Sequence, residues 1–196
     1  MHFSQNLSSR FHCADPFNPA ASITSFIPSA TPGLNMTAEE HAEQVKAELE
    51  DTWLPLIYRN RVLQMRTRSY HFGALPKKPA CEIQHTLLGV ELKVGRRRLL
   101  CPDLATARYL SILARAGCED VAVPYDITKT SQLADELESS WHRMLLLADR
   151  NAAAESDRFR ARVHGLLIAK ARAEVVAAGA GASRPEFKQN TKQRAN

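Results

Sequence analysis

The sequence predicts a small α/β (or α+β) domain, and three local patterns carry this prediction. Thr37 to Glu40 reads Thr-Ala-Glu-Glu, which is a capping box at the start of a helix. Residues 90–94 alternate apolar and charged side chains, the period of a half-buried strand. A third segment repeats an apolar side chain every fourth residue, which is typical of an amphipathic helix: Leu133, Leu137, Trp141 and Leu145.

The first helix is expected to follow Thr37, because Ala42, Val45 and Leu49 fall on one helical face. Pro55 should kink or end this helix, since proline lacks the amide that an interior turn needs. We expect the helix to resume over residues 56–65. Gly73, Pro76 and Pro79 then mark a basic loop that contains Lys77 and Lys78.

Residues 82–101 are predicted to form a hairpin with its turn at Gly95. Ile83 and Leu87 fall on the opposite parity from Leu88, Val90 and Leu92, and one straight strand cannot bury both sets. We therefore expect a bulge or break near Leu88-Gly89.

After the hairpin, Asp103 should cap a helix that Gly117 ends. The apolar run 121–123 then fits a short buried third strand. A strand–helix–strand crossover favours parallel pairing of this third strand with the hairpin. Two further helices should follow residue 126 and end near Gly179.

Composition divides the chain into three parts. Residues 1–36 are polar and aperiodic, so we expect a disordered N-terminal extension, with Met36 as a candidate native start. A single globular domain over 37–179 would comprise an α/β core (37–125) and C-terminal helices (126–179). The basic stretch 180–196 should be a disordered tail.

The net charge of +5 conceals alternating blocks. Residues 37–52 carry −5, residues 53–100 carry +8, residues 101–157 carry −5, and the remainder carries +7. A basic surface would attract the phosphates of DNA or RNA; alternatively, the blocks neutralise each other in the folded domain. The candidate nucleic-acid-binding residues are Arg59, Arg61, Arg66, Arg68, Arg96, Arg97 and Arg98.

One short motif could carry chemistry. Glu91 and Lys93 should lie on the same face of a strand, because side chains two residues apart point the same way. The carboxylate could bind a hard divalent cation while the ammonium orients an attacking water. Alternatively, Glu91 pairs across the hairpin with Arg96 or Arg98 on a solvent-facing surface.

Over Glu82–Tyr125, this strand, the helix after it and the short apolar strand resemble the PD-(D/E)xK nuclease family. The resemblance implies Glu91 as a metal ligand, Lys93 as the partner of the catalytic base, and Mg²⁺ or Mn²⁺ as cofactor. The family also places an acid, usually Asp, on the preceding strand. Glu82 is the only acid available for that role here, and it could act only if the chain turns near Leu88-Gly89.

Three functions follow as expectations. The first is a non-catalytic nucleic-acid-associated or adaptor domain that uses a basic surface, with no cofactor. The second is the metal-dependent nuclease, with Glu82 and Glu91 as metal ligands. The third is an oligomerisation or interaction module that docks a protein partner through the C-terminal helices.

The location expected from the sequence is the cytoplasm. No apolar stretch is long enough to cross a bilayer, so no membrane partner is expected. No Cys-x-x-Cys pair occurs, and reduced thiols fit the four cysteines, which are Cys13, Cys81, Cys101 and Cys118.

Overall fold

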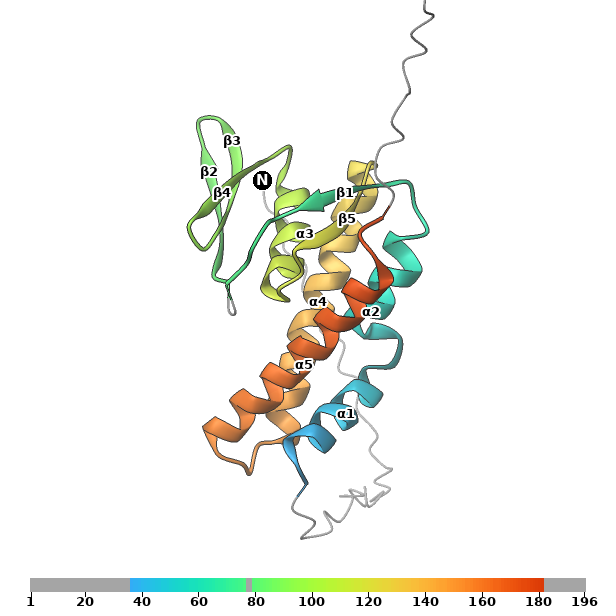
Figure 1. The fold of residues 1–196 in the computed structure, drawn as a ribbon, viewed down its shortest axis with the longest axis vertical. Coiled ribbons are helices and arrows are strands. Elements are labelled where there is room, and N and C mark those ends of the chain that lie inside the picture. The colour runs from blue at the N-terminus through green and yellow to red at the C-terminus, as the bar shows by residue number, and fades with distance from the viewer. Residues whose placement is uncertain (1–35, 77–78, 182–196) are drawn as a thin grey trace, which may run out of the picture. The chain divides into compact units, whose positions relative to one another are not determined.

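A computed structural model describes residues 36–76 and 79–181 of the chain (Figure 1). The predicted disordered extension, apart from Met36, lies outside the described residues, as do Lys77, Lys78 and all of the predicted tail after residue 181. The α-helices and strands are α1 (Ala38–Leu49), α2 (Leu54–Ile57), β1 (Thr67–His71), β2 (Cys81–Thr86), β3 (Gly89–Val94), β4 (Arg97–Cys101), α3 (Leu104–Arg115), β5 (Asp120–Pro124), α4 (Ile127–Asn151) and α5 (Asp157–Ala178). A 3₁₀-helix (Glu50–Thr52) precedes α2, and a π-helix (Tyr58–Val62) follows it.

Helices and two small antiparallel sheets make up the described chain, so the predicted fold class is confirmed. No described helix is long and apolar enough to cross a membrane.

The helix starts predicted at Thr37 and Asp103 are confirmed by their hydrogen bonds. The Thr37 hydroxyl accepts from the Glu40 amide at 3.2 Å, and the Thr37 amide donates to the Glu40 carboxylate at 2.6 Å. Asp103 Oδ1 accepts from the Thr106 amide at 2.7 Å and caps α3. Pro55 does not end a helix but lies in the first turn of α2, where proline is tolerated because first-turn amides have no helical acceptor.

The three-stranded sheet has the order β2-β3-β4. The predicted turn at Gly95 is present, and the expected break is a complete reversal of the chain at Leu87 and Leu88. Leu92 and Val94 of β3 are buried on the face that packs against α3, while Glu91 and Lys93 lie on the other face. The two sets of apolar residues that one straight strand could not bury together therefore belong to two strands, β2 and β3, on either side of the turn.

The predicted parallel pairing of residues 121–123 with the hairpin is wrong. These residues belong to β5, which pairs antiparallel with β1 in a separate two-stranded sheet. β1 was not predicted, because its sequence Thr-Arg-Ser-Tyr-His has no apolar alternation. Its pairing with the apolar strand β5, and not a pattern of its own, makes it a strand.

The core lies on both sides of α3. One side of α3 packs against β2 and β3, and another packs against the long helix α4 (Figure 1). α1 and α5 contact each other and α4. Two ion pairs join an acidic block to a basic one, since Glu43 pairs with Lys170 and Glu136 pairs with Arg61.

Two buried tyrosines close the outer edge of β5. The Tyr58 hydroxyl accepts a hydrogen bond from the Ala122 amide at 2.7 Å, and the Tyr109 hydroxyl donates to the Ala122 carbonyl at 2.6 Å. Both backbone groups of Ala122 therefore point away from β1. The Tyr58 hydroxyl also donates to the Gly179 carbonyl at 2.9 Å, which ties the end of α5 to this sheet.

Alkaline pH should destabilise the fold through two buried acids. Burial raises the pKa of the Tyr58 hydroxyl from 10.0 to about 12, and burial raises the pKa of the Cys118 thiol from 9.0 to about 12. The unfolded chain loses these protons first, so the free energy of unfolding should fall as pH rises from about 9 to about 12. Urea unfolding at several pH values measures this slope. Tyr58→Phe and Cys118→Ala should each flatten it, and a slope that neither substitution alters would contradict the assignment.

Candidate functional site

The sheet face that carries the Glu-x-Lys motif is ion-paired. Glu82 lies directly across from Lys93, and their charged groups are 3.4 Å apart. Arg98 Nη1 lies 3.8 Å from Glu91 Oε2, as one of the two sequence interpretations expected. The turn at Leu87 and Leu88 does bring Glu82 onto the same face as Glu91. The two acids are diagonal neighbours, because Glu82 pairs with Lys93, two residues beyond Glu91.

A divalent metal ion could bind to this face only through carboxylates that are not already paired with a cation. Lysine neutralises Glu82, and the pKa of Glu82 is lowered by hydrogen bonds from Gln84 and Lys93. Over residues 36–76 and 79–181, no group of three or more His, Cys, Asp or Glu side chains could hold a metal ion. Glu91 Oε2 is buried and has no hydrogen-bond partner among the described residues, whereas Glu82 is paired with Lys93, so this face does not present two free carboxylates to Mg²⁺ or Mn²⁺.

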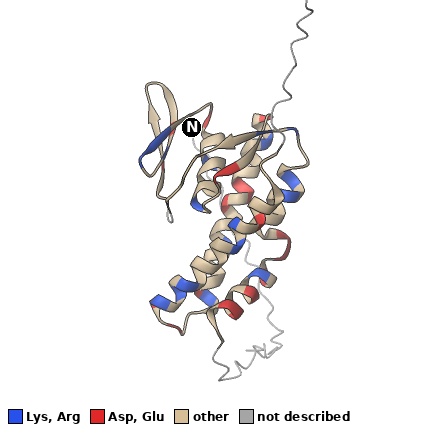
Figure 2. Cartoon of the chain, in the orientation of Figure 1, with Lys and Arg blue, Asp and Glu red and all other residues tan. Residues whose placement is uncertain are grey.

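The seven candidate phosphate-binding arginines form two separate groups (Figure 2). Arg96, Arg97 and Arg98 lie at the turn between β3 and β4 and at the start of β4. The other four lie between α2 and the second residue of β1. Arg61 pairs with Glu136, and Arg66 lies over the Tyr125 ring at 5.2 Å from its centroid.

The apolar stripe of the C-terminal helices faces the interior of the chain. Leu133, Leu137 and Val163 are at most 1% exposed, and Trp141 is 7% exposed. These side chains are therefore core residues. A partner that docked on them would have to displace α1 or α3.

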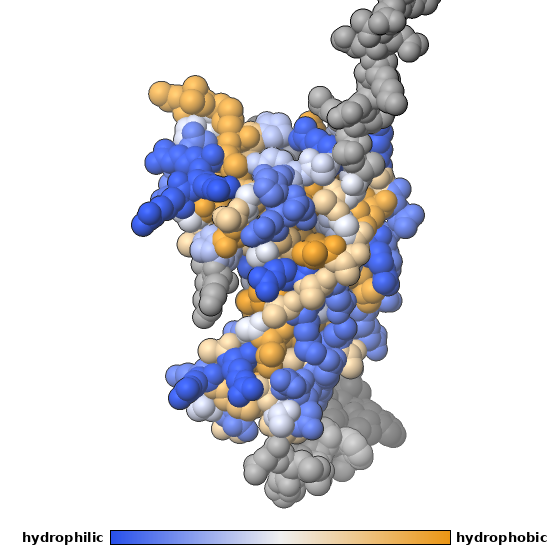
Figure 3. Space-filling view, in the orientation of Figure 1, coloured by the Kyte–Doolittle hydropathy of each residue, from blue (hydrophilic) through white to orange (hydrophobic). Residues whose placement is uncertain are grey.

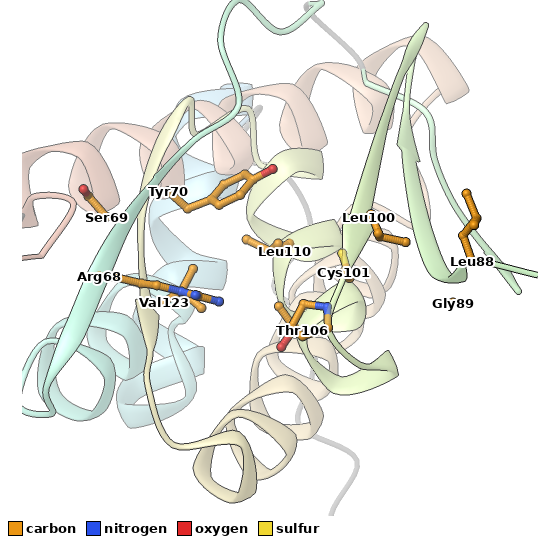
Figure 4. Close-up of a pocket in the computed structure, with 11 residues that line it drawn as sticks. Arg68, Ser69, Tyr70, Leu88, Gly89, Leu100, Cys101, Thr106, Leu110 and Val123 are labelled. Atoms are coloured by element: carbon orange, nitrogen blue, oxygen red, sulfur yellow. The ribbon is translucent and has the colours of Figure 1, made fainter. Parts of the chain in front are cut away.

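A groove with a volume of about 840 Å³ separates the two sheets (Figure 4). One wall is β1, through Arg68, Ser69 and Tyr70. Successive strand residues point to opposite faces, so three in a row can line one groove only if it runs along the edge of the strand. The opposite wall is the end of β4 with the turn before β3, and α3 forms the floor through Thr106 and Leu110.

The edge of β1 that lines this groove has backbone groups without a partner among residues 36–76 and 79–181. In an antiparallel ladder, hydrogen-bonded and non-hydrogen-bonded pairs alternate. Ala122 directs both of its groups to tyrosines, so its partner Ser69 bonds nothing in β5. The amide and carbonyl of Ser69 therefore point toward the groove, and the same alternation directs those of Thr67 outward.

β4 presents its own open edge across the groove. The two-residue turn at Gly95 and Arg96 makes Val94 and Arg97 a hydrogen-bonded pair, so the backbone groups of Leu100 point away from β3. The Arg97 guanidinium donates to the Phe72 carbonyl just after β1. β1 and β4 thus run antiparallel, joined at this end, with the groove between Arg68–Tyr70 and Leu100.

Arg68 is the one charged side chain among the residues that line the groove. Its side chain extends from β1 along the wall toward Val123, and Tyr70 extends toward Leu110 (Figure 4). Nε of Arg68 is buried and has no hydrogen-bond partner among the described residues. A buried guanidinium nitrogen without an acceptor is costly, so this position favours a ligand that carries a carboxylate or another acceptor.

The rim of the groove is apolar. Leu87 is fully exposed, Leu88 is 78% exposed and Leu100 is 64% exposed, and Figure 3 shows the hydrophobic tip that the first two form. Two-residue turns usually contain Gly, Asn or Asp, because these residues readily adopt the positive φ that such turns require. Leucine offers no such advantage for the backbone. Two leucines with neither a packing nor a backbone role indicate a contact surface.

Sequence reasoning grouped Arg68 with the other arginines and did not separate its role. It assigned no function to Leu87 and Leu88, which were used only to locate the break in the hairpin.

Comparisons with protein-family models, with curated proteins and with solved structures found no match to the chain.

Proposed function

We propose that the chain is a non-catalytic adaptor domain that binds an extended peptide segment of a partner protein in the groove between β1 and β4. The observation that carries this proposal is that two unpaired strand edges face one groove beside a guanidinium nitrogen without an acceptor. An extended segment bonds to an exposed strand edge through its main chain, while alternate side chains enter pockets.

The chemistry of the groove specifies the segment. Its inner wall offers Arg68 and Tyr70 above Leu110, and its outer rim offers Leu88 and Leu100. A fitting segment has one acidic side chain toward Arg68 and apolar side chains on the opposite face toward the leucines. Such a segment would also cover the exposed apolar rim.

Selection from a displayed library of random nine-residue peptides on the full chain tests this proposal. We expect enriched peptides to alternate apolar residues around one Asp or Glu. Ser69→Pro should raise their Kd at least tenfold, because proline removes the open-edge amide while the bonds to β5 remain. Arg68→Gln should cause a similar loss, and Leu87→Ser with Leu88→Ser a smaller one.

Ser69→Ala is the matched control for Ser69→Pro, because it keeps the amide and should bind like the wild type. Circular dichroism of every variant must show the wild-type fold. Peptides that bind the Ser69→Pro and Arg68→Gln variants with unchanged Kd would refute the groove, as would a library that yields no binder.

Nucleic-acid binding through the basic surface is the second candidate, and the exposed Arg96 at the tip of its turn is the observation that favours it. Arg97 bonds a backbone carbonyl and Arg98 lies near Glu91, whereas Arg96 has no ion-pair partner in the described part of the chain. A gel shift with DNA and RNA oligonucleotides at low salt tests this candidate. Salt-sensitive retention that is lost in Arg96→Gln would support it over the peptide groove.

A further inference from the structure

A hollow with a volume of about 370 Å³ lies where α3, α4 and α5 meet, and it shares no lining residue with the groove between β1 and β4. Trp141 and Leu145, one turn apart on α4, line it together with Ile168 of α5. Arg115, the last residue of α3, also lines it. The volume lies within the range of about 300–1,000 Å³ that is typical of small-molecule sites.

Gly165 lines the same hollow from the interior of α5. It is not among the described glycines with positive φ, so the backbone does not require a glycine here. A Cβ built on it would meet no neighbouring group within 4 Å, so no close approach of another element requires one either. Glycine destabilises a helix interior relative to alanine. The missing side chain therefore leaves room for a group that the described chain does not supply.

The guanidinium of Arg115 gives the hollow a positive charge. Arg115 is half-buried and has no ion-pair partner in the described part of the chain. Burial raises the pKa of the neighbouring Cys81 thiol, and the charge of Arg115 lowers it only in part. The thiol is thus uncharged at neutral pH and does not neutralise Arg115. A guanidinium in this situation favours a carboxylate, which it can bind through two parallel hydrogen bonds.

We infer that the hollow binds a small aromatic carboxylic acid, with its ring against Trp141 and above Gly165 and its carboxylate on Arg115. Aromatic rings pack favourably against an indole, and the absent side chain at Gly165 lets a flat ring approach the helix backbone. The indole is 7% exposed, and a ligand of this size can contact it without displacing a helix. This site is separate from the peptide groove and does not depend on the proposed function.

Titration of the full chain with naphthylacetate, followed by NMR, tests the inference. The signals of the Gly165 amide and the Trp141 indole should shift and saturate together. The signal of the Trp53 indole should stay in place, because Trp53 does not line the hollow. The uncharged naphthylacetamide should bind at least tenfold more weakly, since it cannot form the charge-assisted pair with Arg115.

Variants of the lining residues locate the probe. Arg115→Gln should raise the Kd for naphthylacetate at least tenfold. Arg143→Gln is the matched control, because it removes the same charge from a position about 200° around α4 from Trp141 and should bind like the wild type.

Gly165→Leu should abolish binding by filling the hollow, yet its Tm should not fall, because leucine favours a helix more than glycine does. For the same reason Gly165→Ala should raise the Tm by about 2–4 °C. A lower Tm in Gly165→Ala would show that packing requires the glycine, and this result would overturn the inference.

The binding data give two further ways to overturn the inference. One is the absence of a saturable shift at Gly165, and the other is binding that survives both Arg115→Gln and Gly165→Leu. Binding that is lost in Arg68→Gln and unchanged in Arg115→Gln would place the probe in the groove between β1 and β4. That outcome would refute the hollow as a site and leave the peptide groove untouched.

Discussion

Replacing Trp53 by alanine should lower the free energy of unfolding by about 3–5 kcal/mol, the cost of removing a large buried aromatic side chain. Trp53 is 1% exposed and lies between the end of α1 and the start of α2. Its indole Nε1 donates to Glu174 of α5 at 2.8 Å, so one side chain joins the N-terminal helices to the last helix. A typical domain has about 5–15 kcal/mol of stability in total, so this variant should be barely folded at 37 °C.

Urea unfolding followed by circular dichroism measures the loss. Glu174→Gln is the appropriate comparison, because it keeps an acceptor for the indole and removes only the charge that pairs with Lys46 at 2.6 Å. That ion pair is more than one third exposed, so its loss should cost about 1 kcal/mol or less. A Trp53→Ala variant as stable as Glu174→Gln would show that the indole is not a core contact.

Tyr58→Phe should cost about 1–3 kcal/mol, although it removes a single oxygen atom. The Tyr58 hydroxyl accepts from Ala122 and donates to Gly179, so its loss leaves a buried amide without an acceptor. Hydrogen exchange of the Ala122 amide should accelerate with the loss of stability. The variant should also loosen the end of α5, because the bond to Gly179 is lost.

Tyr70→Phe provides the matched substitution. Tyr70 is partly buried, and its hydroxyl makes no hydrogen bond to the described residues, so the free energy of unfolding should change by about 0.5 kcal/mol or less. If Tyr58→Phe and Tyr70→Phe were equally stable, the edge of β5 would not depend on the tyrosine.

Local signals in the sequence predicted the helices well. Thr37 and Asp103 cap the helices that they were expected to cap, because a cap is a contact between residues three apart in the chain. Gly117 ends α3 with φ of +81° for the same local reason. The hairpin turn at Gly95 and the break before Gly89 also follow from short-range patterns.

Pairing between distant segments could not be predicted in this way. β1 and β5 are separated by about fifty residues, and β1 carries no apolar alternation, so the antiparallel two-stranded sheet had no local signature. The parallel arrangement expected for residues 121–123 assumed that the hairpin was the available partner. The unpredicted strand β1 took that role.

The groove could not be predicted from the sequence either, because β1, which was not predicted, forms one of its walls. Its walls come from residues 68–70 and 100–101, and no motif links two such segments in a sequence. Two adjacent leucines at the break were the one available signal. Their full significance depends on exposure, which only the folded chain reveals.

The contact between α1 and α5 bears on how the chain folds during synthesis. Glu43 and Lys170 are separated by 127 residues, and Trp53 and Glu174 by 121. A helix that leaves the ribosome early must wait for its partner, and such long-range contacts slow folding. The contacts that α5 makes with α1, and the bond between the Trp53 indole and Glu174, can form only after the C-terminal helix has been synthesised.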